Sequence, residues 1–180
     1  MGRYVALLQG VNVGGNKKVA MADLRLLLAG LGYTEVGTLL NSGNAVLTAG
    51  RGTPQALAAD IERGLHTNLG LHVRCVVRSR ADLAAVIDGH PLRDVATDGS
   101  KMFALFLSDP PAAERLAAAD PRQLAPEHIR IGDGVIYQWC PAGLLASPDV
   151  RAYVEKRWKV AVTGRNWNTV GKLAALLDAK

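Results

Sequence analysis

Residue types that could bind an anion gather at residues 9–18, which read Gln-Gly-Val-Asn-Val-Gly-Gly-Asn-Lys-Lys. Glycines let a backbone approach a ligand closely, and the amides of such a loop can surround a phosphate. Two lysines add positive charge just before a predicted helix. The segment therefore predicts anion binding by Asn12, Gly14, Gly15, Lys17 and Lys18. The alternative is a long turn with solvated lysines.

The order of these residues argues against nucleotide hydrolysis. The segment matches neither the GxxxxGK[ST] pattern nor GxGxxG. Any anion binding here would therefore rest on backbone amides and lysine charge alone.

A second candidate lies at residues 165–169, which read Arg-Asn-Trp-Asn-Thr before the last predicted helix. Free amides and the helix dipole favour an anion at a helix N-terminus, which makes Arg165 and Asn166 candidate ligand contacts. The alternative is a capping motif in which Trp167 anchors the helix to the core. A site shared with the glycine-rich segment would require the two segments to meet in space.

The remaining polar candidates offer no catalytic constellation. Ser42 and Asn44 lie in an Asn-Ser-Gly-Asn stretch typical of a tight turn, where they could contact a ligand, but no general base is evident near Ser42. The four histidines are scattered, and the acidic residues show no metal-binding pattern. We predict no catalytic residue, no metal site and no cofactor.

The charge balance favours anionic partners. Twenty-one basic and 16 acidic residues give a net charge of +5. Both ends are basic: the first 22 residues contain no acid, and residues 151–172 hold six basic residues against Glu155. A solvated basic surface is the alternative reading. The oligomeric state is left open.

Cysteine usage and hydropathy predict a cytoplasmic protein. Cys75 and Cys140 lie in strand-like runs without the spacing of a zinc site, which indicates reduced core thiols. The sequence shows neither a secretory apolar region nor an uninterrupted apolar run of about 18 residues. No membrane partner is expected.

The hydrophobic pattern of the first half predicts strand, helix, strand, strand, helix, strand. Apolar runs and alternation indicate the strands, and Leu24, Leu27, Leu28 and Leu31 at helical spacing indicate the first helix. The predicted ranges are 3–8, 21–31, 35–40, 45–49, 54–69 and 72–78, with the tight turn at 41–44. A capped helix at 79–89 and a polar connection at 90–100 follow.

The second half repeats that order. Its predicted elements are a strand at 101–108, a helix at 110–119 capped by Asp109, strands at 128–131 and 135–140, a helix opened by Ser147 and Pro148, and a strand at 160–163. A final helix, capped by Asn168 or Thr169, ends the chain. The two halves show no residue-level repeat.

The element order predicts an α+β fold of two ferredoxin-like (βαββαβ) units in tandem, with a C-terminal helix. The predicted divisions are 1–78 for the first unit, 79–100 for a helical linker, and 101–180 for the second unit with the final helix. By this pattern we expect the two units to form one compact assembly.

Three pieces of the sequence together resemble the bacterial family catalogued as domain of unknown function 1697. They are residues 10–15 followed by Val19 and Met21, residues 41–44, and residues 165–170 followed by Lys172 and Leu173. The resemblance implies an α+β fold with two ferredoxin-like units and implies no established activity. Members commonly carry arginine before the first loop glycine, where this chain has Gln9, so a charge that could hold an anion is missing here.

Three functions remain open from the sequence. The leading hypothesis is a non-catalytic cytoplasmic protein that binds a phosphate-bearing small molecule or a nucleic-acid backbone through the glycine-rich loop and the segment at Arg165 and Asn166. The second is an enzyme acting on a small anionic substrate, with Ser42, Asn44 or Asn12 in polar roles. The third is a protein-interaction module. RNA binding through aromatic residues on a sheet is disfavoured because aromatics make up only 5% of the chain.

Overall fold

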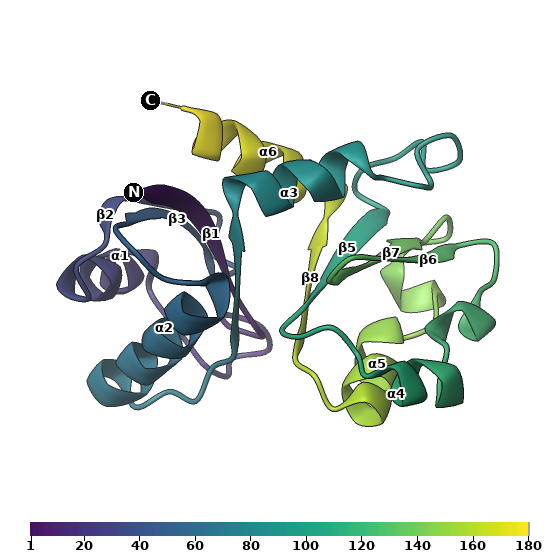
Figure 1. Ribbon diagram of the computed structural model, residues 1–180, viewed down its shortest axis with the longest axis horizontal. Coiled ribbons are helices and arrows are strands. Elements are labelled where there is room, and N and C mark those ends of the chain that lie inside the picture. Colours follow the sequence, from purple (N-terminus) through teal and green to yellow (C-terminus); the bar gives the residue numbers. More distant parts are fainter. Residues whose placement is uncertain (180) are drawn as a thin grey trace. The chain divides into compact units, whose positions relative to one another are not determined.

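The computed structural model describes residues 1–179, which form a mixed α+β protein with two four-stranded antiparallel sheets and six α-helices (Figure 1). The predicted α+β class is confirmed. By its internal contacts the chain divides into two compact units. The first contains residues 1–84 and the residues from 173 onward, and the second contains residues 85–172. Two helices, α3 and α6, therefore run from one unit into the other.

The first unit has the predicted order of strands and helices. Its sheet has the strand order β2-β3-β1-β4, in which every neighbouring pair is antiparallel. The elements are β1 (Gly2–Leu8), α1 (Met21–Gly30), β2 (Thr34–Leu39), β3 (Asn44–Ala49), α2 (Pro54–Leu69), β4 (Cys75–Ser79) and the first half of α3 (Arg80–Asp88).

Local sequence signals set the ends of α2. The Thr53 hydroxyl accepts a hydrogen bond from the amide of Ala56 at 3.2 Å, and Pro54 occupies the first turn, where no amide donor is needed. Gly70 ends the helix with a φ of +65°, which a residue with a side chain rarely adopts. These signals explain why the sequence predicted this helix so closely.

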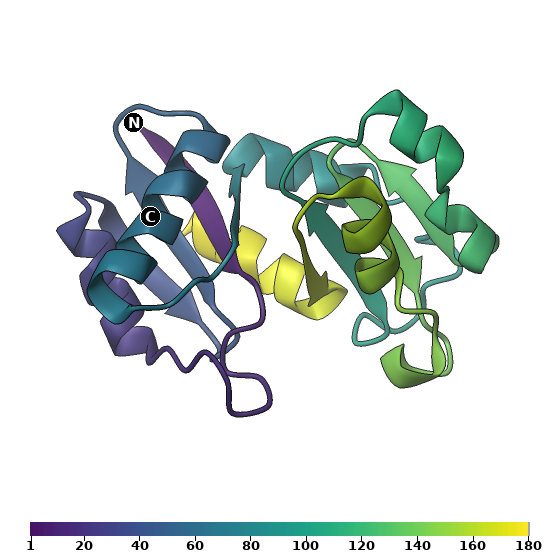
Figure 2. The same cartoon turned by 90° about the horizontal axis from the view of Figure 1, so that it is seen from below.

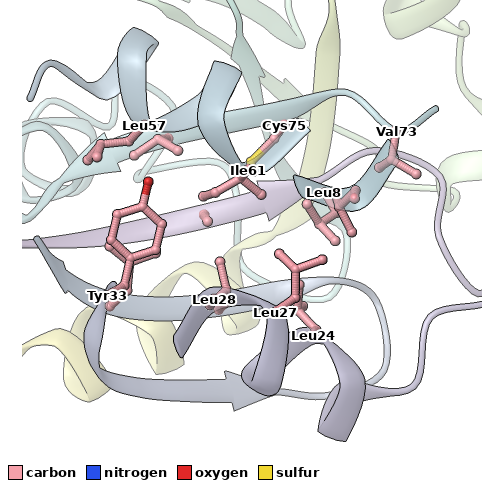
Figure 3. Close-up of a cluster of buried hydrophobic side chains, with 14 of the residues drawn as sticks. Leu8, Leu24, Leu27, Leu28, Tyr33, Leu57, Ile61, Val73 and Cys75 are labelled. Carbon is pink, nitrogen blue, oxygen red and sulfur yellow. The ribbon is translucent and has the colours of Figure 1, made fainter. Parts of the chain in front are cut away.

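The core of the first unit lies between the sheet and helices α1 and α2 (Figure 3). Alternate strand residues point into it, as the two-residue period of a strand requires. The labelled side chains in Figure 3 are Leu8, Leu24, Leu27, Leu28, Tyr33, Leu57, Ile61, Val73 and Cys75.

Polar contacts attach the end of α6 to the first unit. The Arg3 guanidinium donates to the carbonyl oxygen of Leu176 at 3.2 Å and to that of Ala179. Arg80 forms an ion pair with Asp178 at 2.6 Å. The positive charge of Arg3 thus lies where the last carbonyl groups of the helix carry partial negative charge.

The second unit also has the predicted order. Its sheet has the antiparallel strand order β6-β7-β5-β8. The elements are β5 (Met102–Leu107), α4 (Ala113–Ala118), the 3₁₀ turn η1 (Pro121–Leu124), β6 (Ile129–Gly132), β7 (Val135–Trp139), the 3₁₀ turn η2 (Leu144–Ala146), α5 (Val150–Trp158), β8 (Val162–Asn166) and the first half of α6 (Trp167–Asp178).

Several predicted boundaries in this unit were wrong. Helix α5 is capped by Asp149 and begins at Val150, so Ser147 and Pro148 precede it. Helix α4 begins at Ala113, so the prolines at 110 and 111 precede it and Asp109 does not cap it. Strand β8 extends to Asn166 because it pairs with β5, whereas we predicted its end at residue 163. As a result α6 begins at Trp167, and its cap is Asn166 and not Asn168 or Thr169.

The two units share a hydrogen-bonding scheme that their sequences do not reveal. At the end of the first strand of each unit, the amide of Leu8 donates to Gly43 at 2.9 Å and that of Leu107 donates to Gly134 at 3.0 Å. The next backbone amide in each unit donates to the carbonyl oxygen of the residue just before the last strand. Gln9 donates to Arg74 and Ser108 donates to Ala161, each at 2.9 Å.

The same correspondence continues along the last strands. Arg78 pairs with Val5 in the first sheet, and Arg165 pairs with Ala104 at the equivalent position of the second. Each arginine donates to the carbonyl oxygen of the residue before it, at 2.9 Å and 2.8 Å respectively. The two units are therefore built on one backbone plan with different side chains.

Both cysteines are buried and form no disulfide, as predicted. Within the described residues, no helix has the length and apolar character needed to cross a membrane.

Candidate functional site

The connection between β1 and α1 contains a small β-hairpin. Val13 and Asn16 pair as an antiparallel bridge, and Gly14 and Gly15 between them have φ values of +63° and +80°. A two-residue hairpin turn of type I′ requires positive φ at both central residues, which glycine adopts without strain. The turn therefore accounts for both glycines, and the connection from strand to helix contains a hairpin. We call residues 12–18 the hairpin arm.

Asn12 holds the base of the hairpin arm. Its side-chain amide donates to the carbonyl oxygens of Val19, at 2.8 Å, and Asn41, at 2.6 Å. Its side-chain oxygen accepts the amide of Val19 at 2.9 Å, and its own backbone amide donates to Lys17 at 3.2 Å. The Asn12 side chain thus closes the hairpin and ties it to the β2–β3 turn.

The core anchors both ends of the hairpin arm. Val11 and Val19, which flank it, are 1% and 2% exposed and belong to the core of the first unit. Every residue from 12 to 18 is exposed. The arm therefore begins and ends in the core and extends past the sheet into solvent (Figure 2).

The turn between β2 and β3 packs against this base. Gly43 has a φ of +77°, and a Cβ there would lie 2.6 Å from Val11 and 2.7 Å from Leu8. Asn44 is fully buried, and its side chain donates to the Leu39 carbonyl at 3.0 Å and the Ser42 hydroxyl at 2.9 Å. These contacts are structural, so a ligand-binding role for Ser42 and Asn44 stays a prediction.

Two cations and an apolar side chain lie on the exposed part of the hairpin arm. The side chains of Lys17 and Lys18 form no hydrogen bond or ion pair within residues 1–179. Lys17 has a φ of +49°, and Val13 is 65% exposed. The sequence pattern identified the lysines but gave no reason to single out Val13.

Arg165 and Asn166 lie in the second unit, on β8. Arg165 is 9% exposed and donates to the Thr163 hydroxyl at 2.9 Å and the Gly164 carbonyl at 2.8 Å. The Asn166 side-chain oxygen accepts the amide of Thr169 at 2.9 Å and caps α6. These contacts fit the capping alternative, and anion binding by this segment stays a prediction.

A side chain caps the beginning of α3, as one caps the beginning of α6. Ser79 and Asp82 exchange hydrogen bonds between side chain and backbone at 2.9 Å and 3.1 Å, forming the predicted capping box. Ser79 and Asn166 each directly follow the equivalent arginine of their sheet. The structural use of this position in both units favours a structural role for Asn166.

The structure thus collects seven of the nine predicted ligand-binding residues in one region of the first unit. The hairpin arm provides five of them, and the β2–β3 turn bonded to its base provides Ser42 and Asn44. The other two, Arg165 and Asn166, belong to the second unit. No group of three or more metal-binding side chains occurs within residues 1–179.

The equivalent connection in the second unit is much shorter and has no counterpart of the hairpin arm. Residues 9–20 join β1 to α1, whereas residues 108–112 join β5 to α4. The connection in the first unit is seven residues longer, although the hydrogen bonds that begin the two connections are the same. This backbone plan therefore does not require the hairpin arm.

The structure also reveals a buried histidine that sequence reasoning did not distinguish from the others. The His90 ring centre lies 4.3 Å from that of Trp167 and 5.7 Å from that of Tyr137. Its Nδ1 accepts the amide of Leu92 at 3.3 Å. Burial, with the Arg93 charge as a smaller cause, lowers the pKa of His90 below its ordinary value of 6.5.

This lowered pKa predicts acid sensitivity. Below pH 6.5 the unfolded chain binds a proton at His90 while the folded protein resists it, so the free energy of unfolding falls as the pH drops from 6.5 towards the folded-state pKa. We expect urea unfolding at pH 7.5 and 5.5 to show this loss. Tryptophan fluorescence is a suitable probe because all three tryptophans, Trp139, Trp158 and Trp167, lie in the second unit.

The matching variants are His90→Gln and the control His128→Gln. His90→Gln should show a smaller fall in stability between the two pH values, because its amide does not titrate. The control should keep the dependence of the unaltered protein. An unchanged pH dependence in His90→Gln would show that His90 does not cause the effect.

Comparison with known proteins supports the family resemblance. Residues 1–137 match the family described as Protein of unknown function (DUF1697). Comparison with curated proteins gives no match. Among solved structures, the conserved bacterial protein SP0830 from Streptococcus pneumoniae is similar, with a TM-score of 0.67 and 24% sequence identity over 98% of each chain. That similarity concerns the fold.

Proposed function

We propose, from the premise that this chain belongs to the DUF1697 family of proteins of unknown function, that it is a non-catalytic protein that binds phosphate groups through its hairpin arm. The ligand is a phosphate-bearing small molecule or a nucleic-acid backbone, which share the phosphate chemistry. The observation that carries the proposal is the seven-residue excess of the β1–α1 connection over its counterpart in the second unit.

The fold assigned to each unit is part of this proposal. We propose that both are ferredoxin-like units, because each has the order βαββαβ and a sheet in which the first and third strands are central. The shared hydrogen bonds between their first and last strands support the same view. The second unit then serves as an internal reference for what the first unit needs structurally.

Because the second unit has no equivalent of the hairpin arm, the requirements of folding do not explain why the first unit has one. Long connections that are exposed and held by a rigid scaffold commonly carry function. Here Asn12 and the buried valines at 11 and 19 fix the base, so that the exposed lysines are presented on an ordered backbone. Ordering before binding reduces the entropy lost when a ligand binds.

The chemistry of the hairpin arm suits phosphate. Lys17 and Lys18 provide two positive charges, and the first 22 residues of the chain contain no acid to offset them. The amides of Gly14 and Gly15 bond to no backbone acceptor within the described chain. Lysine charge and free amides are the groups that contact phosphate oxygens in proteins. Gln9, at the start of the connection, adds a hydrogen-bonding amide without charge.

We further propose a cytoplasmic location, because the buried free thiols at Cys75 and Cys140 suit a reducing compartment. Arg165 and Asn166 enter the proposal only as a second predicted contact, since both serve the backbone of the second unit.

The test removes the two lysine charges of the hairpin arm. Binding of a labelled ATP analogue and a labelled oligonucleotide is measured by fluorescence anisotropy at several salt concentrations. Lys17→Ala/Lys18→Ala should weaken binding of whichever probe binds by about tenfold at low salt, because two phosphate contacts are lost.

The matched control is Lys156→Ala/Lys159→Ala, in the last turn of α5 and directly after it. Both lysines are exposed, and Lys159 has a φ of +59°, so this pair reproduces the charge change and the backbone conformation of Lys17. The control should bind as the unaltered protein does. Equal affinities for the arm variant and the control would refute the proposal.

A further inference from the structure

We infer that the hairpin arm enters a groove of double-helical nucleic acid, where Val13 and Asn16 contact base edges while Lys17 and Lys18 contact the flanking phosphates. This inference rests on the proposed function and names the ligand class for the same site. It starts from the shape of the arm and from two residues that the phosphate proposal does not use.

The convex shape of the arm favours a polymer over a small nucleotide. Pockets for small molecules are concave and bury most of the ligand. Residues 12–18 are all exposed, and the polar side chain nearest the core, Asn12, has its hydrogen-bonding atoms committed to Val19 and Asn41. A mononucleotide would remain largely in water here, whereas a nucleic-acid backbone can receive contacts from a protruding surface.

The antiparallel pairing at the tip of the arm is related to a form of backbone that a nucleic-acid groove admits. The major groove of B-form DNA is about 12 Å wide and admits a two-stranded β-ribbon. The arm contains one antiparallel residue pair of the kind that builds such a ribbon, Val13 with Asn16, and the turn between them consists of two glycines without side chains. A turn lacking side chains lets the ribbon approach the base edges closely.

Two side chains next to the turn can read bases. Asn16 is exposed, and its side-chain amide makes no hydrogen bond within residues 1–179. Asparagine can bond to both N6 and N7 of adenine, and an aliphatic side chain can contact the methyl group of thymine. Val13, which is 65% exposed and pairs with Asn16, supplies such a side chain. Together they predict a preference for A·T pairs.

A lipid surface is the main competing ligand for lysines beside apolar residues. Val13 and Leu40, in the adjoining turn, are 65% and 55% exposed. Their side chains together carry about half the carbon atoms of a myristoyl chain, which itself binds a membrane only marginally. Two lysines also fall short of the four to eight basic residues of a typical lipid-binding cluster. The double helix is therefore the better match.

The test compares probes that share phosphate chemistry and differ in shape. Anisotropy is measured with a 20-base-pair A·T-rich duplex, a G·C-rich duplex, the A·T-rich single strand and a labelled ATP analogue. The A·T-rich duplex should bind at least about fivefold more tightly than every other probe. Lys17→Ala/Lys18→Ala should reduce the slope of log affinity against log salt by about two for both duplexes.

The base-edge variants separate this inference from phosphate binding. Asn16→Ala and Val13→Ala should each weaken binding to the A·T-rich duplex by at least about fivefold and leave the salt slope unchanged. Both residues are exposed, so both variants should fold as the unaltered protein does by circular dichroism.

The possible failures are distinct. If the single strand or ATP analogue binds as tightly as the duplex and depends on the lysines, the groove inference fails and the phosphate proposal stands. If no phosphate-bearing probe binds, both fail. Binding to anionic vesicles that depends on Val13, with no binding to duplex, would also overturn the inference.

Discussion

Replacing Gly43 with alanine is expected to lower the free energy of unfolding by about 3 kcal/mol, from overpacking together with the cost of a left-handed residue. A Cβ at this position would lie 2.6 Å from Val11 and 2.7 Å from Leu8. Neither neighbour can retreat easily, because both are 1% exposed and packed in the core. Urea unfolding followed by far-UV circular dichroism measures the loss.

Gly15→Ala is the matched control for Gly43→Ala. Gly15 has a φ of +80°, but no atom lies within 4 Å of the position a Cβ would take. The free energy of unfolding of Gly15→Ala should therefore fall only by the cost of the left-handed conformation, about 1 kcal/mol. Equal losses in the two variants would show that packing beneath Gly43 is not the cause.

Gly43→Ala should also affect the hairpin arm. The Gly43 carbonyl accepts the Leu8 amide at 2.9 Å, and the adjoining Asn41 carbonyl accepts the Asn12 side chain. A shift of this turn would therefore move the base of the arm. Weakened phosphate binding by folded Gly43→Ala protein is the expected functional consequence.

Replacing Trp158 with alanine is expected to destabilise the second unit by about 4 kcal/mol, the range for removing a large buried aromatic side chain. Trp158 is fully buried in the core of this unit, and its indole donates to the Ala119 carbonyl at 2.9 Å. The variant loses the packing of the indole ring, and the Ala119 carbonyl loses its hydrogen-bond donor. Fluorescence of Trp139 and Trp167, which remain in this unit, follows its unfolding.

Two controls separate these contributions. Trp158→Phe keeps an aromatic ring but loses the hydrogen bond, so its loss should be smaller, at about 1–3 kcal/mol. Leu145→Ala removes a fully exposed side chain and should change the stability by less than about 0.5 kcal/mol. A loss in Trp158→Ala no larger than in Leu145→Ala would contradict the packing described for Trp158.

Local sequence signals predicted most of the secondary structure. Helical spacing of Leu24, Leu27 and Leu28 placed a buried stripe on α1, and all three are buried. Thr53 and Gly70 marked the ends of α2. These predictions succeeded because periodicity and capping depend on residues a few positions apart.

The prediction that failed at the end of β8 depended on a partner distant in the sequence. Pairing with β5 extends β8 through Arg165 and Asn166, whereas the sequence pattern predicts its end at residue 163. Arg165, which we predicted as a ligand contact, is only 9% exposed in this strand. Charge alone could not reveal this, because burial is set by the strands and helices that pack around a residue.

The hairpin arm combines both kinds of information. Its sequence determined that the backbone would adopt positive φ at glycines and that two lysines would follow, but those residue types suit both an anion-binding loop and a tight hairpin turn. Only the tertiary structure showed that the backbone forms a hairpin, because the bridge from Val13 to Asn16 and the bonds of Asn12 require particular approaches of separate backbone segments. Anion binding by this hairpin stays a prediction. The sequence thus specified the chemistry of the arm, and the packed fold specified which of its groups remain available for a ligand.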